Sequence, residues 1–360
     1  DMIDSYNFED RKLVEIVKAT YFNPKIVVID ETTTALSQEG REELYKHMER
    51  IRKSGNTVIF ISHDLPEIIE KSDTITILRD GVYIDTVKSK DVNENDLKKL
   101  MVGREVTGDY YRSDYGEKVS DEVVLSVKDV TVPGLIENVS FDLHKGEILG
   151  FGGLSESGMH EIGKAIFGAS YDREGTVELA DGTQINDIPT AIKHSIAYTS
   201  KDRDNESVVL NQSIGDNICL PSLDELSGPA HLISDKKKKD FANKFAKQMS
   251  VKMVDVNQFV SNLSGGNKQK VVLARWIGKD SDIVVLDSPT RGIDIKVKQD
   301  IYQLMNQMRK NGKSIIMISE ELMELIGMCD RIMIMKDGKI SGELERDQNL
   351  DENGLITMMV

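Results

Sequence analysis

The chain has 360 residues, 39% of them hydrophobic and 30% charged, which is typical of a soluble globular protein with two or a few domains. A formal net charge of −15 argues against sequence-independent nucleic-acid binding, because such binding needs a basic surface. Two cysteines offer no disulfide framework, and no apolar run approaches the roughly 20 residues of a membrane-spanning helix.

The first part of the chain predicts two buried parallel strands joined by a helix. The runs "IVVID" at 26–30 and "VIFIS" at 58–62 are continuous, apolar and rich in β-branched residues, as in strands covered on both faces. Between them, residues 40–55 have the amphipathic pattern of a helix that ends at Gly55. A hairpin follows, so the order indicates an α/β fold with crossover connections.

Asp30 and Glu31 end the first of these strands, and His63 follows the second. An aspartate at such a strand end can organise Mg²⁺ while the glutamate positions or deprotonates water, which suits phosphoryl transfer. A histidine at the next strand end can contact a terminal phosphate and hold that water. The alternative is a pair of carboxylates on a solvated loop. The internal repeat of the chain, together with His63, favours the phosphoryl-transfer site.

Residues 103–122 are polar and lack hydrophobic periodicity, so we interpret them as a linker between residues 1–102 and 123–360. The second of these segments also contains strands and a Gly-rich turn that have no counterpart in the first.

The two segments repeat at one fixed offset in residue number. "PKIVVIDETTTALS" in the first resembles "SDIVVLDSPTRGID" in the second. The offset is 287 − 30 = 257 for Asp30 and Asp287, and 338 − 81 = 257 for Gly81 and Gly338. An offset that is constant over so long a stretch predicts two copies of one structural unit.

The second copy lacks the residues that suggested chemistry in the first. At the same offset, Asp287 matches the aspartate, but Ser288 takes the place of Glu31 and Glu320 takes the place of His63. Neither a general base nor a phosphate-contacting histidine remains, so this copy is expected to be chemically disabled.

A Gly-rich turn in the second segment also keeps the pattern of a motif but lacks its ligand-binding residues. Residues Gly153–His160, "GLSESGMH", keep the G-x-x-x-x-G spacing of a P-loop between a strand and a helix. Gly153 and Gly158 are in place, but Met159 stands where the phosphate-binding lysine is expected, and His160 replaces the Mg²⁺-binding serine or threonine. The alternative is a plain strand–helix turn. The context favours a P-loop ancestry without P-loop activity.

The stretch "SNLSGGNKQK" carries Ser264, Gly265, Gly266 and Asn267 at a predicted helix start. Such a turn presents a hydroxyl and free backbone N–H groups to an anion. Its counterpart in the first copy, "YNFEDRK" at 6–12, has lost both glycines. A backbone that must approach phosphate closely does not readily carry those side chains.

Together these motifs resemble the ATP-binding cassette (ABC) ATPases over nearly the whole chain. "LSGGNKQKVVLARW" resembles the signature of that family, "IVVIDE" its Walker B strand and "ISHDL" its switch-histidine loop. The tandem arrangement is most similar to the fused double-cassette subunit of bacterial simple-sugar importers, without the front part of the first cassette. The resemblance implies a P-loop NTPase-type α/β fold with a parallel core sheet, an antiparallel β subdomain and a helical subdomain at about 208–262.

In that family two cassettes close head to tail, and each ATP lies between one P-loop and the signature of the other cassette. The resemblance therefore implies one consensus composite site for ATP and Mg²⁺, in which Asp30, Glu31 and His63 face Ser264–Asn267. The opposite site would combine the altered Gly153–His160 turn, the altered Walker B residues Asp287 and Ser288, and Glu320 with "YNFEDRK". The 360 residues contain no lysine-bearing P-loop, so this chain by itself is expected to be inactive.

The resemblance also implies membrane permease subunits as partners and, indirectly, a sugar-binding protein, at the cytoplasmic face of the membrane. A second hypothesis is a non-catalytic assembly module, favoured by Met159, Ser288 and Glu320 but not by the intact signature. A third is a soluble double-cassette factor acting on ribosomes or DNA, which would be expected to keep two working sites and basic surfaces.

Overall fold

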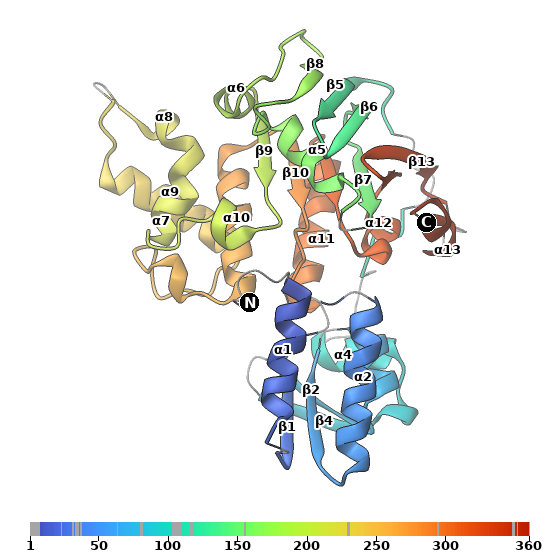
Figure 1. The fold of residues 1–360 in the computed structure, drawn as a ribbon. Coiled ribbons are helices and arrows are strands. Elements are labelled where there is room, and N and C mark those ends of the chain that lie inside the picture. The colour runs from blue at the N-terminus through green and yellow to red at the C-terminus, as the bar shows by residue number, and fades with distance from the viewer. Residues whose placement is uncertain are drawn as a thin grey trace. The chain divides into compact units, whose positions relative to one another are not determined.

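A computed structural model describes most of the chain and divides it into two compact units. The first unit comprises residues 1–108 with 294–296, and the second comprises 109–293 with 297–360. Figure 1 shows the elements of each. The residues that the structure describes are 8–22, 24–30, 32, 36, 38–62, 64–79, 82–102, 110–114, 119–154, 156–228, 231–293, 295–347, 350 and 352–359.

The first unit contains a parallel strand pair and a separate hairpin. β1 and β2 run parallel, with Ile26 opposite Thr57 and Asp30 opposite Ile61, and β3 and β4 run antiparallel. The strand–helix–strand–hairpin order predicted from the sequence is therefore present. The elements are α1 (Phe8–Thr20), β1 (Ile26–Asp30), α2 (Gln38–Lys53), β2 (Thr57–Ile61), α3 (Leu65–Lys71), β3 (Thr74–Arg79), β4 (Val82–Lys88), η3 (Ser89–Asp91) and α4 (Glu94–Val102).

The second unit is larger and carries its main core in a six-stranded sheet of order β13-β12-β7-β11-β10-β9. Its elements are β5 (Val123–Val132), β6 (Ile136–His144), β7 (Ile148–Gly153), α5 (Met159–Ile166), β8 (Glu174–Leu179), α6 (Ile188–Lys193), β9 (Ile196–Thr199), η4 (Arg203–Ser207), α7 (Ile214–Cys219), η5 (Leu220–Ser222), α8 (Leu223–Leu226), α9 (Asp235–Gln248), η7 (Val260–Asn262), α10 (Gly265–Lys279), β10 (Ile283–Asp287), α11 (Ile295–Lys310), β11 (Ser314–Ile318), α12 (Leu322–Met328), β12 (Arg331–Lys336), β13 (Lys339–Glu345) and α13 (Glu352–Met359).

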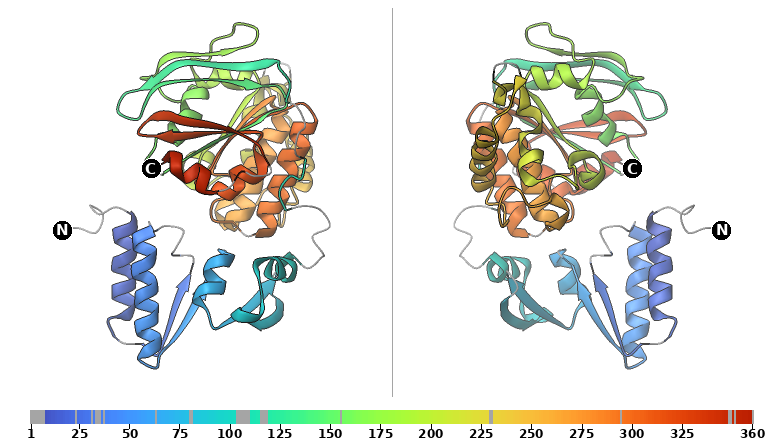
Figure 2. Two further views of the ribbon diagram at one scale, coloured as in Figure 1. Left: turned by 90° about the vertical axis from the view of Figure 1, so that its right-hand side faces the viewer. Right: turned by 90° about the vertical axis from the view of Figure 1, so that its left-hand side faces the viewer.

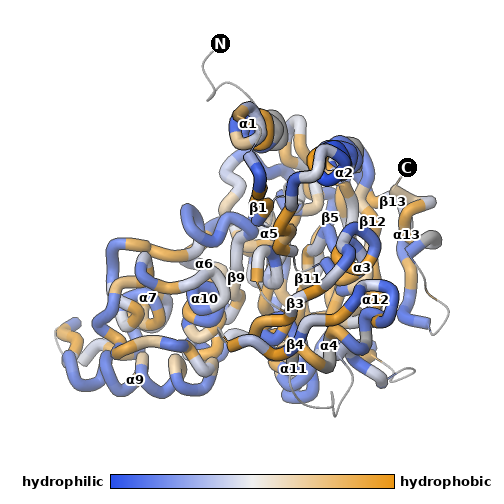
Figure 3. Tube along the Cα trace, turned by 90° about the horizontal axis from the view of Figure 1, so that it is seen from below, coloured by the Kyte–Doolittle hydropathy of each residue, from blue (hydrophilic) through white to orange (hydrophobic). Residues whose placement is uncertain are grey.

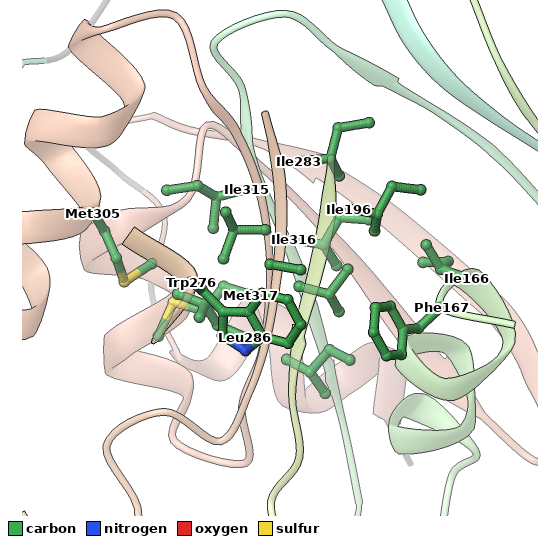
Figure 4. Packing of buried hydrophobic residues seen from close by; sticks show 14 of the residues in the cluster. Ile166, Phe167, Ile196, Trp276, Ile283, Leu286, Met305, Ile315, Ile316 and Met317 are labelled. Carbon is green, nitrogen blue, oxygen red and sulfur yellow. The ribbon is translucent and has the colours of Figure 1, made fainter. Parts of the chain in front are cut away.

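Within this sheet only the β12–β13 pairing is antiparallel; the other pairings are parallel. β10 and β11 are buried along their whole length, as expected for parallel strands covered on both faces. A second, antiparallel sheet of order β6-β5-β8 forms a separate layer of the unit, visible in Figure 2. Figure 4 shows part of the buried cluster that fills the space around the six-stranded sheet.

The helical part of the second unit packs through a narrow apolar stripe. α9 is mostly hydrophilic along its length in Figure 3, and it buries only Ala242, Phe245 and Ala246. α9 packs against α7 and α10. Its three buried side chains belong to the same buried cluster as those of the six-stranded sheet. The region is thus an amphipathic helical layer joined to the main core.

The repeat holds residue by residue at the level of secondary structure. The bounds of β1, α2, β2, α3, β3 and β4 recur, at the same offset, as those of β10, α11, β11, α12, β12 and β13. Even the irregularity of the hairpin recurs: the register shifts between Ile77 and Leu78, and again between Ile334 and Met335. Two copies of one structural unit, as predicted from the offset, are therefore confirmed for these elements.

A hydrogen-bonded trio, half-buried in the first unit and buried in the second, recurs as well. In the first unit, Tyr45 and Ser62 both donate to the carboxylate of Glu67, the serine at 2.7 Å. The trio ties α2, the end of β2 and α3 together, so it positions the loop between β2 and α3. Its counterparts in the second unit are Tyr302, Ser319 and Glu324, joined in the same way.

Part of the segment predicted as a linker packs on the second unit. Arg112 is 4% exposed and donates to the carbonyl oxygen of Met328 at 2.8 Å and to Asp330 Oδ1 at 2.7 Å. Tyr111 lies against Gly327, where a Cβ atom would collide with its ring. The predicted boundaries of 1–102, 103–122 and 123–360 stay predictions, but residues 110–114 belong to the second compact unit.

Candidate functional site

In the first unit, Asp30 ends β1 beside Ile61, the last residue of β2. Parallel strands place both of their carboxyl ends at one edge, where ligands of α/β proteins bind. The Thr32 hydroxyl donates to the carbonyl oxygen of Asp30 at 3.3 Å, which shapes the chain after the strand. The two other predicted residues of this edge, Glu31 and His63, lie outside the described residues.

In the second unit, the Gly-rich turn connects β7 to α5, in the strand–turn–helix context that a P-loop requires. Gly158 precedes the helix at φ +89°, and a Cβ there would approach the carbonyl oxygen of Leu135 to 2.6 Å. Gly153 has no room for a Cβ either, because Met335 O would lie 2.7 Å from it. Both glycines are therefore required by the turn itself.

Met159 begins α5 and is completely buried in the main core cluster. The lysine of a P-loop reaches into the phosphate site, whereas this side chain points into the protein interior. Its replacement has thus converted a ligand-binding position into a packing position.

His160 follows and lies between two carboxylates. Its Nδ1 is 2.7 Å from Asp287 Oδ1, and its Nε2 is 3.3 Å from Glu320 Oε1. An ionised carboxylate only accepts hydrogen bonds, so a ring between two ionised carboxylates donates from both nitrogens, as an imidazolium does. Burial opposes the charge, but the hydrogen bonds to Asp287 and Glu320 prevail and raise the pKa of His160.

Glu320 is held ionised by its neighbours. The hydrogen bond from His160 lowers the pKa of Glu320 to about 2, against the effect of burial. Lys201 Nζ lies 3.9 Å from Glu320 Oε1 and adds a second positive charge. Ser288, at φ +48°, places its hydroxyl 3.3 Å from Asp287 Oδ1, where it donates a hydrogen bond. The altered turn, Asp287, Ser288 and Glu320 thus form one connected cluster.

The signature motif lies at the start of α10. Ser264 is the N-cap, and its hydroxyl accepts a hydrogen bond from Asn267 Nδ2 at 2.9 Å rather than capping the helix. Asn267 Oδ1 in turn accepts from the backbone N–H of Lys252 at 2.7 Å. Among the described residues, no hydrogen bond or ion pair joins Ser264–Asn267 to the Gly153–His160 turn.

Two features of these sites were not predicted from the sequence. One is Arg203, whose Nη2 lies 3.1 Å from the position of a Cβ on Gly265, so it places a cation beside the signature. The charged run at 201–204 was its only signal. The other is the pairing of His160 with Glu320, which are complementary in charge but lie in distant parts of the sequence.

Comparisons with known proteins identify the family and the fold of the chain. A family model described as ABC transporter matches residues 136–291. The ribose import ATP-binding protein RbsA of Clostridium tetani is 38% identical over 347 residues, which is 96% of this chain and 68% of that protein. The xylose import ATP-binding protein XylG of Thermoanaerobacter pseudethanolicus is 43% identical over 347 residues, covering 94% of this chain and 68% of that protein.

A solved dimeric structure of a bacterial ABC transporter cassette superposes with a TM-score of 0.55 at 22% identity, covering 62% of this chain and 99% of that one. The α/β ABC cassette fold expected from the sequence is therefore confirmed. The chain belongs to the family of ABC transporter ATP-binding proteins. In the part of the chain that the structure describes, no helix is long and apolar enough to cross a membrane.

Proposed function

We propose that the chain is part of the ATP-hydrolysing subunit of an importer for a simple sugar, with one consensus composite ATP site and one altered site. The observation that carries the proposal is the distribution of the motifs. Asp30, Glu31 and His63 are intact in the first copy, and their trans partner Ser264–Gly266 is intact in the second. Every motif of the opposite site carries changes. The relatives named for ribose and xylose import, similar over nearly the whole chain, support sugar as the substrate class.

The first unit supports a composite site through an exposed apolar face of its strand pair. Ile26, Val28, Ile59 and Ile61 are 45–59% exposed. In the second unit the four counterparts are at most 4% exposed, because neighbouring strands and α5 cover them: Ile283, Val285, Ile316 and Ile318.

α5 is the helix that follows the P-loop-like turn. A Cβ on its Gly163 would lie 3.0 Å from Ile318 and 3.4 Å from Val285, so the helix packs directly on the sheet. The exposed face of β1 and β2 thus fits the same pair of elements, a P-loop strand with its helix. We propose that such a strand and helix carry the phosphate-binding P-loop lysine, because residues 1–360 contain no lysine-bearing P-loop.

In this site Mg²⁺ would neutralise phosphate charge and orient the nucleotide. Asp30 is the residue proposed to hold it, in agreement with its position at the carboxyl end of β1. Glu31 would position or deprotonate the attacking water, and His63 would hold that water against the terminal phosphate. The backbone N–H groups at the start of α10, beside Arg203, would stabilise the phosphate from the other cassette.

The test is ATP turnover by the 360-residue chain with and without a supplied fragment that carries the front of a first cassette, including G-x-x-x-x-G-K-[ST]. Turnover only in the mixture is expected, and it should be lost when the fragment's P-loop lysine is changed to alanine. A mixture that forms a complex but neither binds nor hydrolyses ATP would contradict the proposal.

That contrary outcome would favour the second candidate, a non-catalytic assembly module of a transporter. The observation behind it is the filled second site, in which Met159 is a core residue and His160 is paired with carboxylates. Under either function, the proposed partners are the permease subunits of the importer and, indirectly, a sugar-binding protein, with the chain at the cytoplasmic face of the membrane.

A further inference from the structure

Three residues of the second site act together, and two of them, His160 and Glu320, depart from the consensus. Asp287 is the counterpart of Asp30, His160 stands where a P-loop has its Mg²⁺-binding hydroxyl, and Glu320 stands in the place of His63. Taken singly, His160 and Glu320 are two losses of function. The structure shows that they compensate each other, because the new cation and the new anion are hydrogen-bonded.

The His160 ring engages one oxygen of each carboxylate. His160 is 4% exposed and Asp287 is 1% exposed, and the imidazolium bridges Asp287 Oδ1 at 2.7 Å and Glu320 Oε1 at 3.3 Å. Buried charges are tolerated only when they are paired and hydrogen-bonded, which this arrangement achieves within the protein. Among the described residues, no group of three or more His, Cys, Asp and Glu side chains is arranged to hold a metal ion.

These residues do not fit a Mg²⁺–nucleotide. A divalent cation at Asp287 would compete for an oxygen that the imidazolium already uses, and it would lie next to that positive charge. A polyphosphate would meet the Glu320 carboxylate where the consensus site offers a histidine. It would also lack a lysine partner, since Met159 is in the core.

We propose that the His160 imidazolium is a built-in cation that takes the place of Mg²⁺ in the second site, so that this site binds neither Mg²⁺ nor a Mg²⁺–nucleotide. The inference rests on the proposed function for the correspondence between the two sites. The inference predicts that each chain binds one Mg²⁺–nucleotide. In the second site, the charges of His160, Asp287 and Glu320 balance one another without any bound ligand.

The experiment measures Mn²⁺, a spectroscopic substitute for Mg²⁺, by electron paramagnetic resonance with the 360-residue chain. An Asp30→Asn background removes the proposed ligand of the first site. In this background the chain with His160 is expected to bind no Mn²⁺ at the second site. His160→Ser removes the imidazolium, leaves Asp287 and Glu320 facing a hydroxyl, and should lower the Mn²⁺ dissociation constant at least about tenfold.

Two further variants make the result specific. Adding Asp287→Asn to His160→Ser should abolish the gained Mn²⁺ binding. The matched control is His144→Ser, since His144 also contacts a carboxylate, with Nδ1 3.1 Å from Glu147 Oε2, but lies outside the site. It should leave Mn²⁺ binding unchanged.

The proposal is overturned if the chain with His160 intact binds Mn²⁺ or Mg²⁺–ATP saturably and Asp287→Asn removes that binding. It is also overturned if His160→Ser, shown by circular dichroism to be folded, gains no Mn²⁺ affinity. If His160→Ser does not fold, the measurements with His160 intact decide the question. None of these binding measurements requires ATP turnover. The proposed function can therefore fail in the mixing experiment while this inference stands, and this inference can fail while the mixture hydrolyses ATP.

Discussion

The two copies of the repeat have the same framework and different contents. β1 and β10, α2 and α11, and the two hairpins have matching bounds at the constant offset of the repeat. Yet the first copy keeps the residues proposed for chemistry, whereas the second fills the equivalent space with its own side chains. The comparison teaches that this fold tolerates loss of a ligand site when the replacing residues satisfy one another's charge and packing.

The two copies also differ in how completely side chains fill the space beside their strands. In the first unit, α1, β1 and α2 line a cavity of about 260 Å³ that is partly open to solvent, and its lining includes Ala19, Thr20 and His47. Their counterparts in the second unit are all large and apolar: Trp276, Ile277 and Leu304. Trp276 is 6% exposed and belongs to the core cluster with Met305 (Figure 4). The second copy therefore has the more completely filled core.

The largest expected effect separates the two copies by chemistry. With the front of the first cassette supplied, Glu31→Gln should lower ATP turnover about 10³-fold, because the water loses its proposed base. The matched change in the second copy is Ser288→Asn, since asparagine tolerates the left-handed backbone at φ +48°. Turnover by this control should change less than about twofold. Equal losses from both variants, measured by steady-state phosphate release, would refute the division into one working and one altered site.

The next effect tests the difference in core filling. Trp276→Ala should lower the free energy of unfolding of the second unit by about 3–5 kcal/mol, since it removes a buried aromatic side chain from a packed cluster. Ala19→Trp introduces the same side chain into the cavity of the first unit and should change stability by less than about 1.5 kcal/mol. Urea unfolding followed by circular dichroism measures both. A small loss for Trp276→Ala would show that the second core is not the better packed of the two.

The repeat, the strand ends and the fold class were predictable because they depend on local pattern. Apolar runs such as 26–30 and 283–287 predict parallel strands, and one constant offset aligns β1, α2, β2, α3, β3 and β4 with their counterparts. The prediction that both faces are covered holds for β10 but is wrong for β1, in which Ile26 and Val28 are exposed. Asp30, Asp287 and the start of α10 lie where the sequence predicted. The roles of Glu31 and His63 stay predictions, because both lie outside the described residues.

What the sequence did not reveal depends on partners far apart in the chain. His160 and Glu320 were interpreted as separate losses, because nothing local links them. Arg112 looked like one charge in a polar linker, yet its hydrogen-bond partners Met328 and Asp330 lie near the other end of the chain. Ala19 in an amphipathic helix is unremarkable until its counterpart proves to be a buried tryptophan.

A smaller effect concerns the docked segment at 110–114, which packs on the second copy. Gly327→Ala should destabilise the second unit by about 1–3 kcal/mol, because the new Cβ would overlap the ring of Tyr111 and displace it. The counterpart in the first copy is Glu70, whose change to alanine should stay within about 0.5 kcal/mol. Limited proteolysis between residues 103 and 122 should accelerate for Gly327→Ala alone. Unchanged proteolysis would mean that the glycine does not control docking.

The smallest expected effect is the pH dependence of the His160 cluster. A histidine whose pKa is raised on folding stabilises the protein below its unfolded pKa near 6.5, and this contribution is lost as pH rises through the higher folded value. Glu320, with its pKa lowered to about 2, contributes above about pH 4.5 and loses that contribution as pH falls toward 2. The stability difference between the chain with His160 and the His160→Ser variant should therefore be greatest between about pH 4.5 and 6.5, and it should decline on the alkaline side as His160 loses its proton.

The first copy serves as the internal reference for that experiment. His47 lines its cavity, and its Nε2 contacts the Thr20 hydroxyl at 3.2 Å rather than a carboxylate. His47→Ser removes an imidazole whose hydrogen-bond partner is a hydroxyl, so it is the matched control and should not give the same maximum between about pH 4.5 and 6.5. Urea unfolding at a series of pH values measures both variants. A difference for His160→Ser that is flat from about pH 4.5 to 9 would mean that the ring is bound as a neutral group, and the second site would then need a different explanation for its charge balance.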